Sequence, residues 1–178
     1  MPHSSTDFKL EIQSHLDKNF SRDIKILDVG PGAGMYGHLL SKYSNVLNRS
    51  LGFKLDCLEI YPPYIEKYNL KEAYENIFEG DICSFDFTNY GYIILGDILE
   101  HLTIKDAQRV INKINDNKIK CMVAVPYLSK QGEHEGNIYE NHLQEDLTQE
   151  IMKQRYPSLK LLIGNEDYGY YINYNSKI

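Results

Sequence analysis

The chain contains 178 residues, of which 42% are hydrophobic and 25% charged, and its formal net charge is −6. This length and composition are typical of one folded domain and exclude a mainly disordered chain. The negative charge disfavours non-specific binding to nucleic acid, which depends on many contacts between basic side chains and phosphates. No apolar run approaches the roughly 18 residues of a membrane-spanning helix, so we expect no membrane contact.

The N-terminal residues and the cysteines indicate the cellular compartment. No basic stretch followed by an apolar core stands near Met1, so we predict no secretory signal. Cys57, Cys83 and Cys121 are odd in number and form no CxxC pair, which disfavours a disulfide framework and a zinc knuckle. We therefore expect a cytoplasmic protein. The oligomeric state stays open.

The first half of the chain alternates predicted helices and strands. An amphipathic helix is expected over residues 5–20, capped by Ser5 or Thr6. We expect it to cover the site as an N-terminal segment (residues 1–22), ahead of the main domain (residues 23–178). Periodicity then predicts strands at 24–30, 53–61, 73–81 and 90–97, and helices at 33–43 and 62–68.

The second half continues the alternation and closes differently. A helix is predicted from Thr103 to Asn115, where Thr103 and Asp106 resemble a capping box. Its apolar stripe is expected to consist of Ile104, Ala107, Ile111 and Ile114. Further elements are a strand at 120–127, a polar loop at 128–143, a helix at 148–156, and strands at 159–164 and 167–174.

The turn between the last two strands is too short for a crossover, so these strands must form an antiparallel hairpin. On the last strand, Tyr168, Tyr170, Ile172 and Tyr174 alternate and should share one sheet face. The predicted fold is therefore α/β, with a doubly wound seven-stranded sheet that is mostly parallel and ends in an antiparallel C-terminal hairpin.

A glycine-rich turn, ILDVGPGAG, follows the first strand. Gly30, Gly32 and Gly34 permit a sharp turn with positive φ and let a ligand lie against the backbone. Asp28, still on the strand, could brace this loop or meet a ligand's ammonium group. Gly32, Gly34 and Gly37 also match the dinucleotide fingerprint, two residues further from the strand than is usual. A nicotinamide (NAD(P))-linked oxidoreductase is therefore one alternative.

The turn resembles motif I of the class I S-adenosylmethionine-dependent methyltransferases, and the resemblance extends over residues 20–175. It implies the Rossmann-like fold of that family, S-adenosylmethionine as cofactor, and Asp28 and the three glycines as contacts to it. It also implies that Glu59 binds the ribose hydroxyls and Asp81 the adenine amino group. Ile60 and Ile82 would then enclose the adenine ring.

The segment YIILGDILEHL (residues 92–102) resembles motif IV of the same family, which implies that Asp97 contacts the cofactor. Asp97, Glu100, His101 and the later His142 could together hold a divalent metal such as Mg. The pattern is similar to those of ubiquinone-biosynthesis O-methyltransferases and of metal-binding small-RNA 2′-O-methyltransferases. The same residues could instead line the substrate site without a metal.

The acidic and histidine residues favour methylation of oxygen, because a hydroxyl acceptor must lose a proton as it attacks. His101 and His142 are the candidate catalytic bases, since imidazole titrates near neutral pH. The expected acceptor is a small molecule or a glycan-type compound. A third alternative is a non-catalytic partner subunit that has kept the fold.

Overall fold

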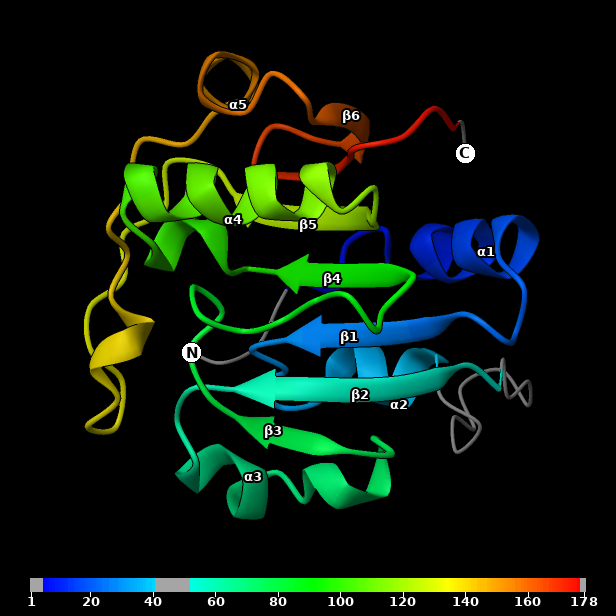
Figure 1. Ribbon diagram of the computed structural model, residues 1–178. Helices are drawn as coiled ribbons and strands as arrows, with labels where there is room; N and C mark the ends of the chain where they lie inside the picture. Colours follow the sequence, from blue (N-terminus) through cyan, green and yellow to red (C-terminus); the bar gives the residue numbers. More distant parts are fainter. Residues whose placement is uncertain (1–4, 41–51, 177–178) are drawn as a thin grey trace.

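A seven-stranded sheet forms the centre of the computed structural model, which describes residues 5–40 and 52–176 (Figure 1). The strand order is β3-β2-β1-β4-β5-β7-β6. Strands β1 to β5 are parallel, and β7 is antiparallel to both β5 and β6, which confirms the predicted fold class. The strands are β1 (Lys25–Val29), β2 (Lys54–Glu59), β3 (Ile77–Glu79), β4 (Tyr92–Gly96), β5 (Lys120–Pro126), β6 (Lys160–Gly164) and β7 (Tyr168–Ile172).

The turn from β6 to β7 is closed by one side chain. The Asn165 side-chain oxygen accepts hydrogen bonds from the backbone N–H groups of Asp167 and Tyr168, both at 2.9 Å. Such an Asx turn reverses the chain within a few residues. Strand β7 therefore returns beside β6 and occupies the position between β6 and β5.

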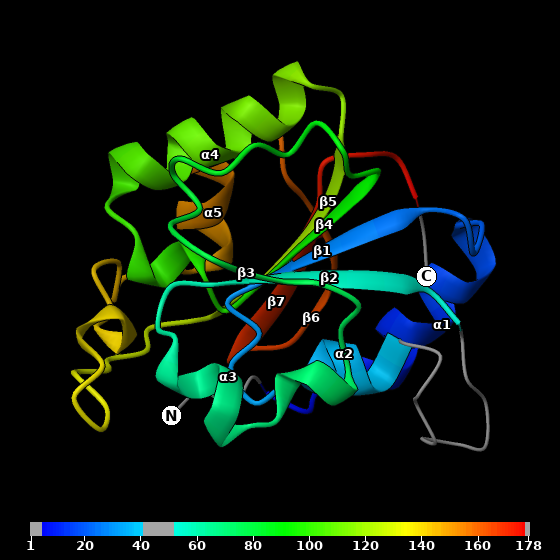
Figure 2. The same cartoon turned by 60° about the horizontal axis from the view of Figure 1, so that its bottom comes forward.

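Helices cover both faces of the sheet, as Figure 2 shows. The strand β5 explains this, because its side chains alternate between two apolar cores: Val123 and Val125 face one, and Met122 and Ala124 face the other. Helices α4 and α5 cover the first face, and α1, α2 and α3 cover the second. The helices are α1 (Lys9–Asn19), α2 (Met35–Leu40), α3 (Pro63–Lys67), α4 (Ile104–Asp116) and α5 (Gln149–Arg155).

The start of α1 differs from the prediction. The capping position is Phe8, which has φ 59° and provides no side-chain cap, so the expected cap by Ser5 or Thr6 was wrong. Instead, the Ser5 hydroxyl accepts a hydrogen bond from the backbone N–H of Asp7 at 3.1 Å. Of the helix expected at 33–43, residues 41–43 lie outside the described part of the chain.

Helix α4 begins as predicted, but its buried stripe is shifted. The Thr103 hydroxyl accepts from the Asp106 N–H at 3.2 Å and donates to the Asp106 carboxylate at 2.7 Å. Ile104 is 41% exposed, whereas Val110 is buried. Ile104 is the first residue of the helix, and the buried stripe begins one turn later with Ala107 and includes Val110.

The predicted face of the last strand is confirmed: Tyr168, Tyr170 and Ile172 are buried in the same core, and Tyr174 packs against it. Ile12 and Leu16 of α1 lie in that core as well. The N-terminal helix packs on this sheet face next to α2, and Ser5, which precedes it, borders the cavity described below. In the residues that the structure describes, no helix has the length and apolar character needed to cross a membrane.

Candidate active site

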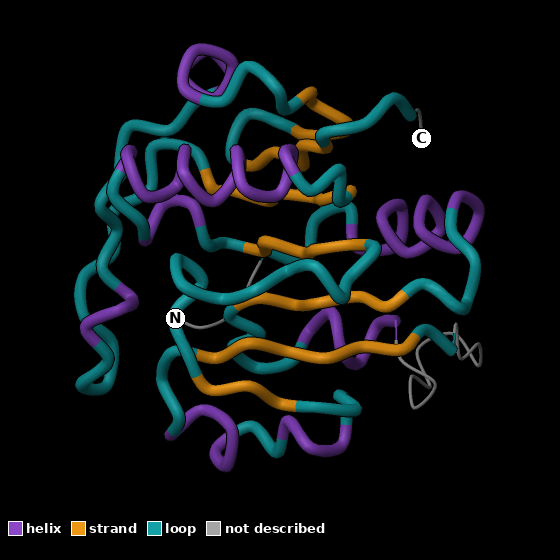
Figure 3. Tube along the Cα trace, viewed as in Figure 1, coloured by secondary structure: helices purple, strands orange, loops and turns teal. Residues whose placement is uncertain are grey.

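A cavity of about 300 Å³ opens at the edge of the sheet where the parallel strands end. The loops that follow β1, β2, β3 and β4 all leave this edge (Figure 3). The strand order reverses here between β1 and β4, which is where open α/β sheets bind ligands. The predicted site residues that border the cavity are Gly30, Gly32, Glu59, Ile60, Asp81, Ile82, Asp97, Glu100, His101 and His142.

The glycine turn adopts the backbone conformation that the sequence predicts. Gly30, Gly32 and Gly34 have φ values of 58°, 52° and 76°, a left-handed backbone region that residues other than glycine rarely adopt. The Gly30 N–H donates to the carbonyl of Leu58 at 2.8 Å, which ties the turn to the end of β2. Gly34 lies behind the turn and does not border the cavity.

Asp28, expected to contact the cofactor, is buried beneath the turn and does not border the cavity either. Its carboxylate accepts a hydrogen bond from the Tyr74 hydroxyl at 2.5 Å. Burial raises the pKa of Asp28 to about 7, and the Tyr74 hydrogen bond and the nearby Lys9 oppose this rise. Of the two roles left open by the sequence, the structure therefore places Asp28 as a brace.

Gly37, the third glycine of the dinucleotide fingerprint, serves packing. A Cβ atom there would lie 2.6 Å from the Tyr74 ring and 2.8 Å from the Ala73 side chain. The Gly37 N–H also donates to the Tyr74 hydroxyl at 3.1 Å. This glycine lets α2 approach the segment before β3. The third glycine of the dinucleotide fingerprint also serves close packing, so Gly37 does not distinguish a nicotinamide dinucleotide from S-adenosylmethionine.

Two carboxylates border the cavity from adjacent strands. Glu59 ends β2 and is 3% exposed, and its Oε1 accepts from the Tyr61 N–H at 2.8 Å. Burial raises the pKa of Glu59 to about 7, while that backbone hydrogen bond opposes the rise. Asp81, two residues after β3, is exposed, and its Oδ1 accepts from the Cys83 N–H at 2.8 Å.

Asp97 follows β4 in a left-handed conformation, with φ 56°. Its Oδ1 accepts from the Tyr168 hydroxyl at 2.5 Å, and its buried Oδ2 has no hydrogen-bond partner within the described residues. Asp97 is not among the side chains that gather as potential metal ligands. The prediction of Asp97 as a ligand is therefore corrected, because its carboxylate is turned toward β7.

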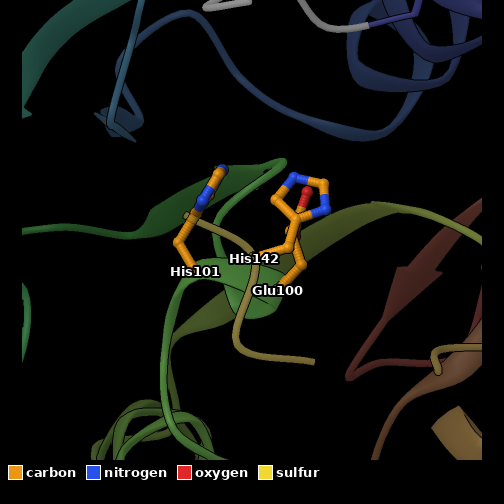
Figure 4. A group of neighbouring side chains, drawn as sticks. All are labelled: Glu100, His101 and His142. Atoms are coloured by element: carbon orange, nitrogen blue, oxygen red, sulfur yellow. The ribbon is translucent and has the colours of Figure 1, made fainter. Parts of the chain in front are cut away.

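The other three expected ligands do lie together. One donor atom from each of Glu100, His101 and His142 lies within 4.8 Å of the others, and Figure 4 shows the two imidazole rings beside each other near the carboxyl group. Burial raises the pKa of Glu100 well above its usual value, with Asp97 adding to the rise. Burial and the neighbouring His142 lower the pKa of His101.

Backbone contacts bring these residues together from distant parts of the chain. Glu100 lies in the 3-10 helix η3 (Leu99–His101), and its carbonyl accepts from the N–H groups of Leu143 and Gln144, at 2.7 and 3.1 Å. The buried Gln144 side-chain amide donates to the carbonyls of Leu99 and Leu102, at 2.7 and 3.1 Å. Gln144 thus fastens η3 to the segment that carries His142.

The polar loop 128–143 contributes more to the cavity than its composition predicts. A 3-10 helix in this loop, η4 (Ile138–Glu140), is capped by Asn137, whose side-chain oxygen accepts from the Tyr139 N–H at 3.0 Å. His134 is half-buried and does not border the cavity. Asn137 is a residue type favoured at helix N-caps, so the sequence held a signal for this short helix. Its cavity-lining residues are Ser129, Gln131, Asn137, Tyr139, Glu140 and His142.

Comparison with known proteins identifies the fold. No protein-family model matches the sequence, and no curated protein matches it. A TehB-like SAM-dependent methyltransferase from Corynebacterium glutamicum superposes with a TM-score of 0.60 at 15% identity, over 90% of this chain and 84% of that one. The mitomycin 7-O-methyltransferase MmcR gives 0.59 at 13% identity, over 92% of this chain and 53% of that one.

A third similar structure is the O-methyltransferase NcsB1 of neocarzinostatin biosynthesis, in complex with S-adenosylhomocysteine and 1,4-dihydroxy-2-naphthoic acid. It has a TM-score of 0.56 at 11% identity, and the match covers 93% of this chain and 56% of that one. The chain thus spans about half the length of the two O-methyltransferases. At these identities the likeness concerns architecture, and the chain has the Rossmann-like fold of S-adenosylmethionine-dependent methyltransferases.

Proposed function

We propose that the protein is an S-adenosylmethionine-dependent methyltransferase that methylates an oxygen atom of a small-molecule or glycan-type acceptor. One observation carries this proposal: Glu59 and Asp81, at the ends of neighbouring strands, border the same cavity as the positive-φ glycine turn. Two hydrogen-bond acceptors at these places suit the hydroxyl groups of a pentose and the amino group of a purine.

The lining residues give the cofactor one orientation. The pentose lies at Glu59, whose carboxylate accepts from its hydroxyls, and the purine lies between Ile60 and Ile82, with its amino group at Asp81. The amino acid end then lies along the glycine turn toward Asp97. The unpartnered Oδ2 of Asp97 can accept from the ammonium group there.

The acceptor occupies the remaining part of the cavity, beside the two histidines. The sulfonium methyl group is already activated, so the protein must align the attacking oxygen and exclude water. A neutral imidazole of His101 or His142 can take the hydroxyl proton as the new bond forms. Similar structures include a mitomycin 7-O-methyltransferase and a naphthoic acid complex, which supports an oxygen atom on a small molecule.

One feature counts against a nicotinamide-linked oxidoreductase. The antiparallel β7 departs from the parallel order 3-2-1-4-5-6 of dinucleotide-binding sheets. A thermal shift experiment separates the two: S-adenosylhomocysteine should raise the melting temperature, and NAD(H) and NADP(H) should leave it unchanged.

The decisive test is calorimetric titration with S-adenosylhomocysteine. Glu59→Ala should weaken binding at least about tenfold, because hydrogen bonds to a charged acceptor contribute roughly 1.5–3 kcal/mol. Glu79→Ala is a matched control: Glu79 is the register neighbour of Glu59 on β3, but it is exposed and does not border the cavity. Equal affinities in all three proteins would overturn the cofactor assignment.

Methyl transfer itself needs a separate assay. We expect the protein to release S-adenosylhomocysteine from S-adenosylmethionine when it is supplied with a pool of phenols and sugar nucleotides. Cofactor binding without turnover on any member of the pool would favour the non-catalytic partner subunit instead.

A further inference from the structure

Glu100 poses a binding problem that the methyl-transfer scheme leaves open. The residue is 1% exposed, and neither of its carboxylate oxygens has a hydrogen-bond partner among the described residues. A buried carboxylate is costly unless it is paired with a cation or satisfied by donors. Glu100 borders the cavity, so a ligand in the cavity can supply the missing donors.

The charges around the cavity indicate the sign of that ligand. Five acidic residues border the cavity, namely Glu59, Asp81, Asp97, Glu100 and Glu140. In the part of the chain that the structure describes, no lysine or arginine borders it. The proposed cofactor accounts for the first three acids, which leaves Glu100 and Glu140 on the acceptor side. An acceptor with a phosphate or carboxylate group would meet like charges there, whereas a cationic group would be attracted.

The two histidines indicate where the acceptor hydroxyl lies relative to that cationic group. His101 Nδ1 lies 3.2 Å from the Asn141 carbonyl, and His142 Nδ1 lies 2.9 Å from the Ser129 carbonyl. A carbonyl oxygen only accepts, so each Nδ1 carries the hydrogen and each neutral ring keeps a lone pair on Nε2. A hydroxyl group can therefore donate to either ring, beside the carboxyl group of Glu100 (Figure 4).

We infer that the acceptor is a vicinal amino alcohol, which carries an ammonium group on the carbon next to the methylated hydroxyl. Glu100 accepts from the ammonium group, and His101 or His142 accepts from the hydroxyl. One polar atom from each of these three residues lies within 4.8 Å of the others, so the two ligand groups must also lie close together. An amino sugar with a free amine is the glycan-type member of this class. The inference rests on the proposed function and narrows its acceptor.

The ammonium group also decides which atom receives the methyl group. A protonated amine has no lone pair, so it cannot attack the sulfonium while Glu100 keeps it charged. The hydroxyl proton passes to a histidine Nε2, the oxygen forms the new O–C bond, and the S–CH₃ bond breaks with its electron pair on sulfur. The positive charge beside the hydroxyl favours loss of its proton. Methylation is thereby directed to oxygen although an amine lies next to it.

Glucosamine is the probe, and N-acetylglucosamine and glucose are its matched uncharged analogues. Saturation-transfer NMR titrations use the full chain, alone and saturated with S-adenosylhomocysteine, with a chelator present throughout. We expect glucosamine to bind at least about tenfold more tightly than either analogue, because hydrogen bonds between charged groups are stronger than neutral ones. Glu100→Gln should remove this advantage. Glu133→Gln is the control, because Glu133 is exposed on loop 128–143 and does not border the cavity.

Equal binding of the three sugars by the unaltered protein, or no binding of glucosamine, would overturn the inference. It also fails if Glu100→Gln, folded by circular dichroism, binds glucosamine as tightly as Glu133→Gln. The comparison of the three sugars needs no variant, so it decides the question if Glu100→Gln does not fold. Calorimetry of the same samples separates the two failures. Intact S-adenosylhomocysteine binding without a preference for glucosamine rejects the acceptor class alone, whereas absent S-adenosylhomocysteine binding rejects the proposed function.

Discussion

The wall of the cavity that holds Glu59 and Asp81 differs from the wall that holds His101 and His142 in how its residues are placed. On the first wall, each side chain stands within two residues of a strand end, and the parallel ladder fixes the distance between strands. On the second wall, a 3-10 helix and a loop some forty positions later meet through the Glu100 carbonyl and the Gln144 amide.

This difference teaches that cofactor binding and acceptor chemistry depend on different kinds of support. The first wall is part of the sheet, so disturbing it requires disturbing the core. The second wall depends on a few hydrogen bonds, and a single substitution of Gln144 removes those that its side chain makes. Substitutions in the second wall should therefore change turnover while leaving S-adenosylhomocysteine affinity nearly unaltered. Measuring both quantities tests whether the two walls act separately.

The largest effect is expected for His142→Ala. Loss of an imidazole that acts on the acceptor proton typically reduces the rate by about 10²–10⁴-fold. We expect turnover to fall at least about hundredfold, with the dissociation constant of S-adenosylhomocysteine unchanged within about twofold. Steady-state kinetics and calorimetry measure the two quantities, and His134→Ala is the control.

A parallel weakening of cofactor binding in His142→Ala would contradict the separation of the two walls. Glu59→Ala provides the opposite pattern, since it should weaken S-adenosylhomocysteine binding while leaving the histidines in place. Comparing both variants in one experiment therefore tests the division itself.

The same division explains what could be read from the sequence. Glu59 and Asp81 were predictable because carboxyl ends of parallel strands meet at one edge, so local position implies spatial position. The orientation of the Asp28 side chain was not predictable, because its hydrogen-bond partner Tyr74 lies 46 residues away and nothing in the sequence pattern links the two residues. The exposure of Ile104 was equally unpredictable, because helical periodicity does not show at which turn of a helix the buried stripe begins.

For the second wall, the sequence supplied the residue types but not their support. His101 and His142 were chosen for their chemistry, and the structure places them together. Gln144 has no chemical signature and was not predicted, yet it contacts Leu99, Leu102 and Tyr156. Residues that act by satisfying distant backbone groups leave no local pattern to read.

An intermediate effect is therefore expected for Gln144→Leu. This change removes the side-chain partner of the Leu102 carbonyl and of the Tyr156 hydroxyl, and it leaves the Leu99 carbonyl with only the Leu102 N–H as donor. Unpaired buried polar groups cost about 1–3 kcal/mol. We expect the free energy of unfolding to fall by about 2 kcal/mol and turnover to fall with it, as His142 loses its support. Urea denaturation measures the first quantity.

Gln154→Leu is the matched control, because Gln154 is exposed and its side-chain amide donates to the Glu150 side chain on the surface of α5. It should stay within about 0.5 kcal/mol of the unaltered protein. If Gln144→Leu were equally mild in stability and turnover, Gln144 would not be the fastening point of the second wall.

The smallest effect on binding and turnover concerns the support of the first wall, which appears instead as a pH dependence of stability. The pKa of Asp28 is about 7 in the folded protein, against a usual value of 3.8. Between these values the folded state holds a proton that the unfolded state has released. The free energy of unfolding therefore falls as pH rises from about 4 to 7, by up to about 1.4 kcal/mol per pH unit from this group.

Asp28→Asn removes this titration while keeping an oxygen that can accept from the Tyr74 hydroxyl. Relative to the unaltered protein, the variant should gain stability steadily between pH 4.5 and 7 and no further above pH 7, as urea denaturation at four pH values would show. Since Asp28 does not border the cavity, S-adenosylhomocysteine affinity should stay the same. A stability difference that is constant with pH would mean that Asp28 is already ionised beneath the turn, and the first wall would then rest on a buried charge rather than on a neutral brace.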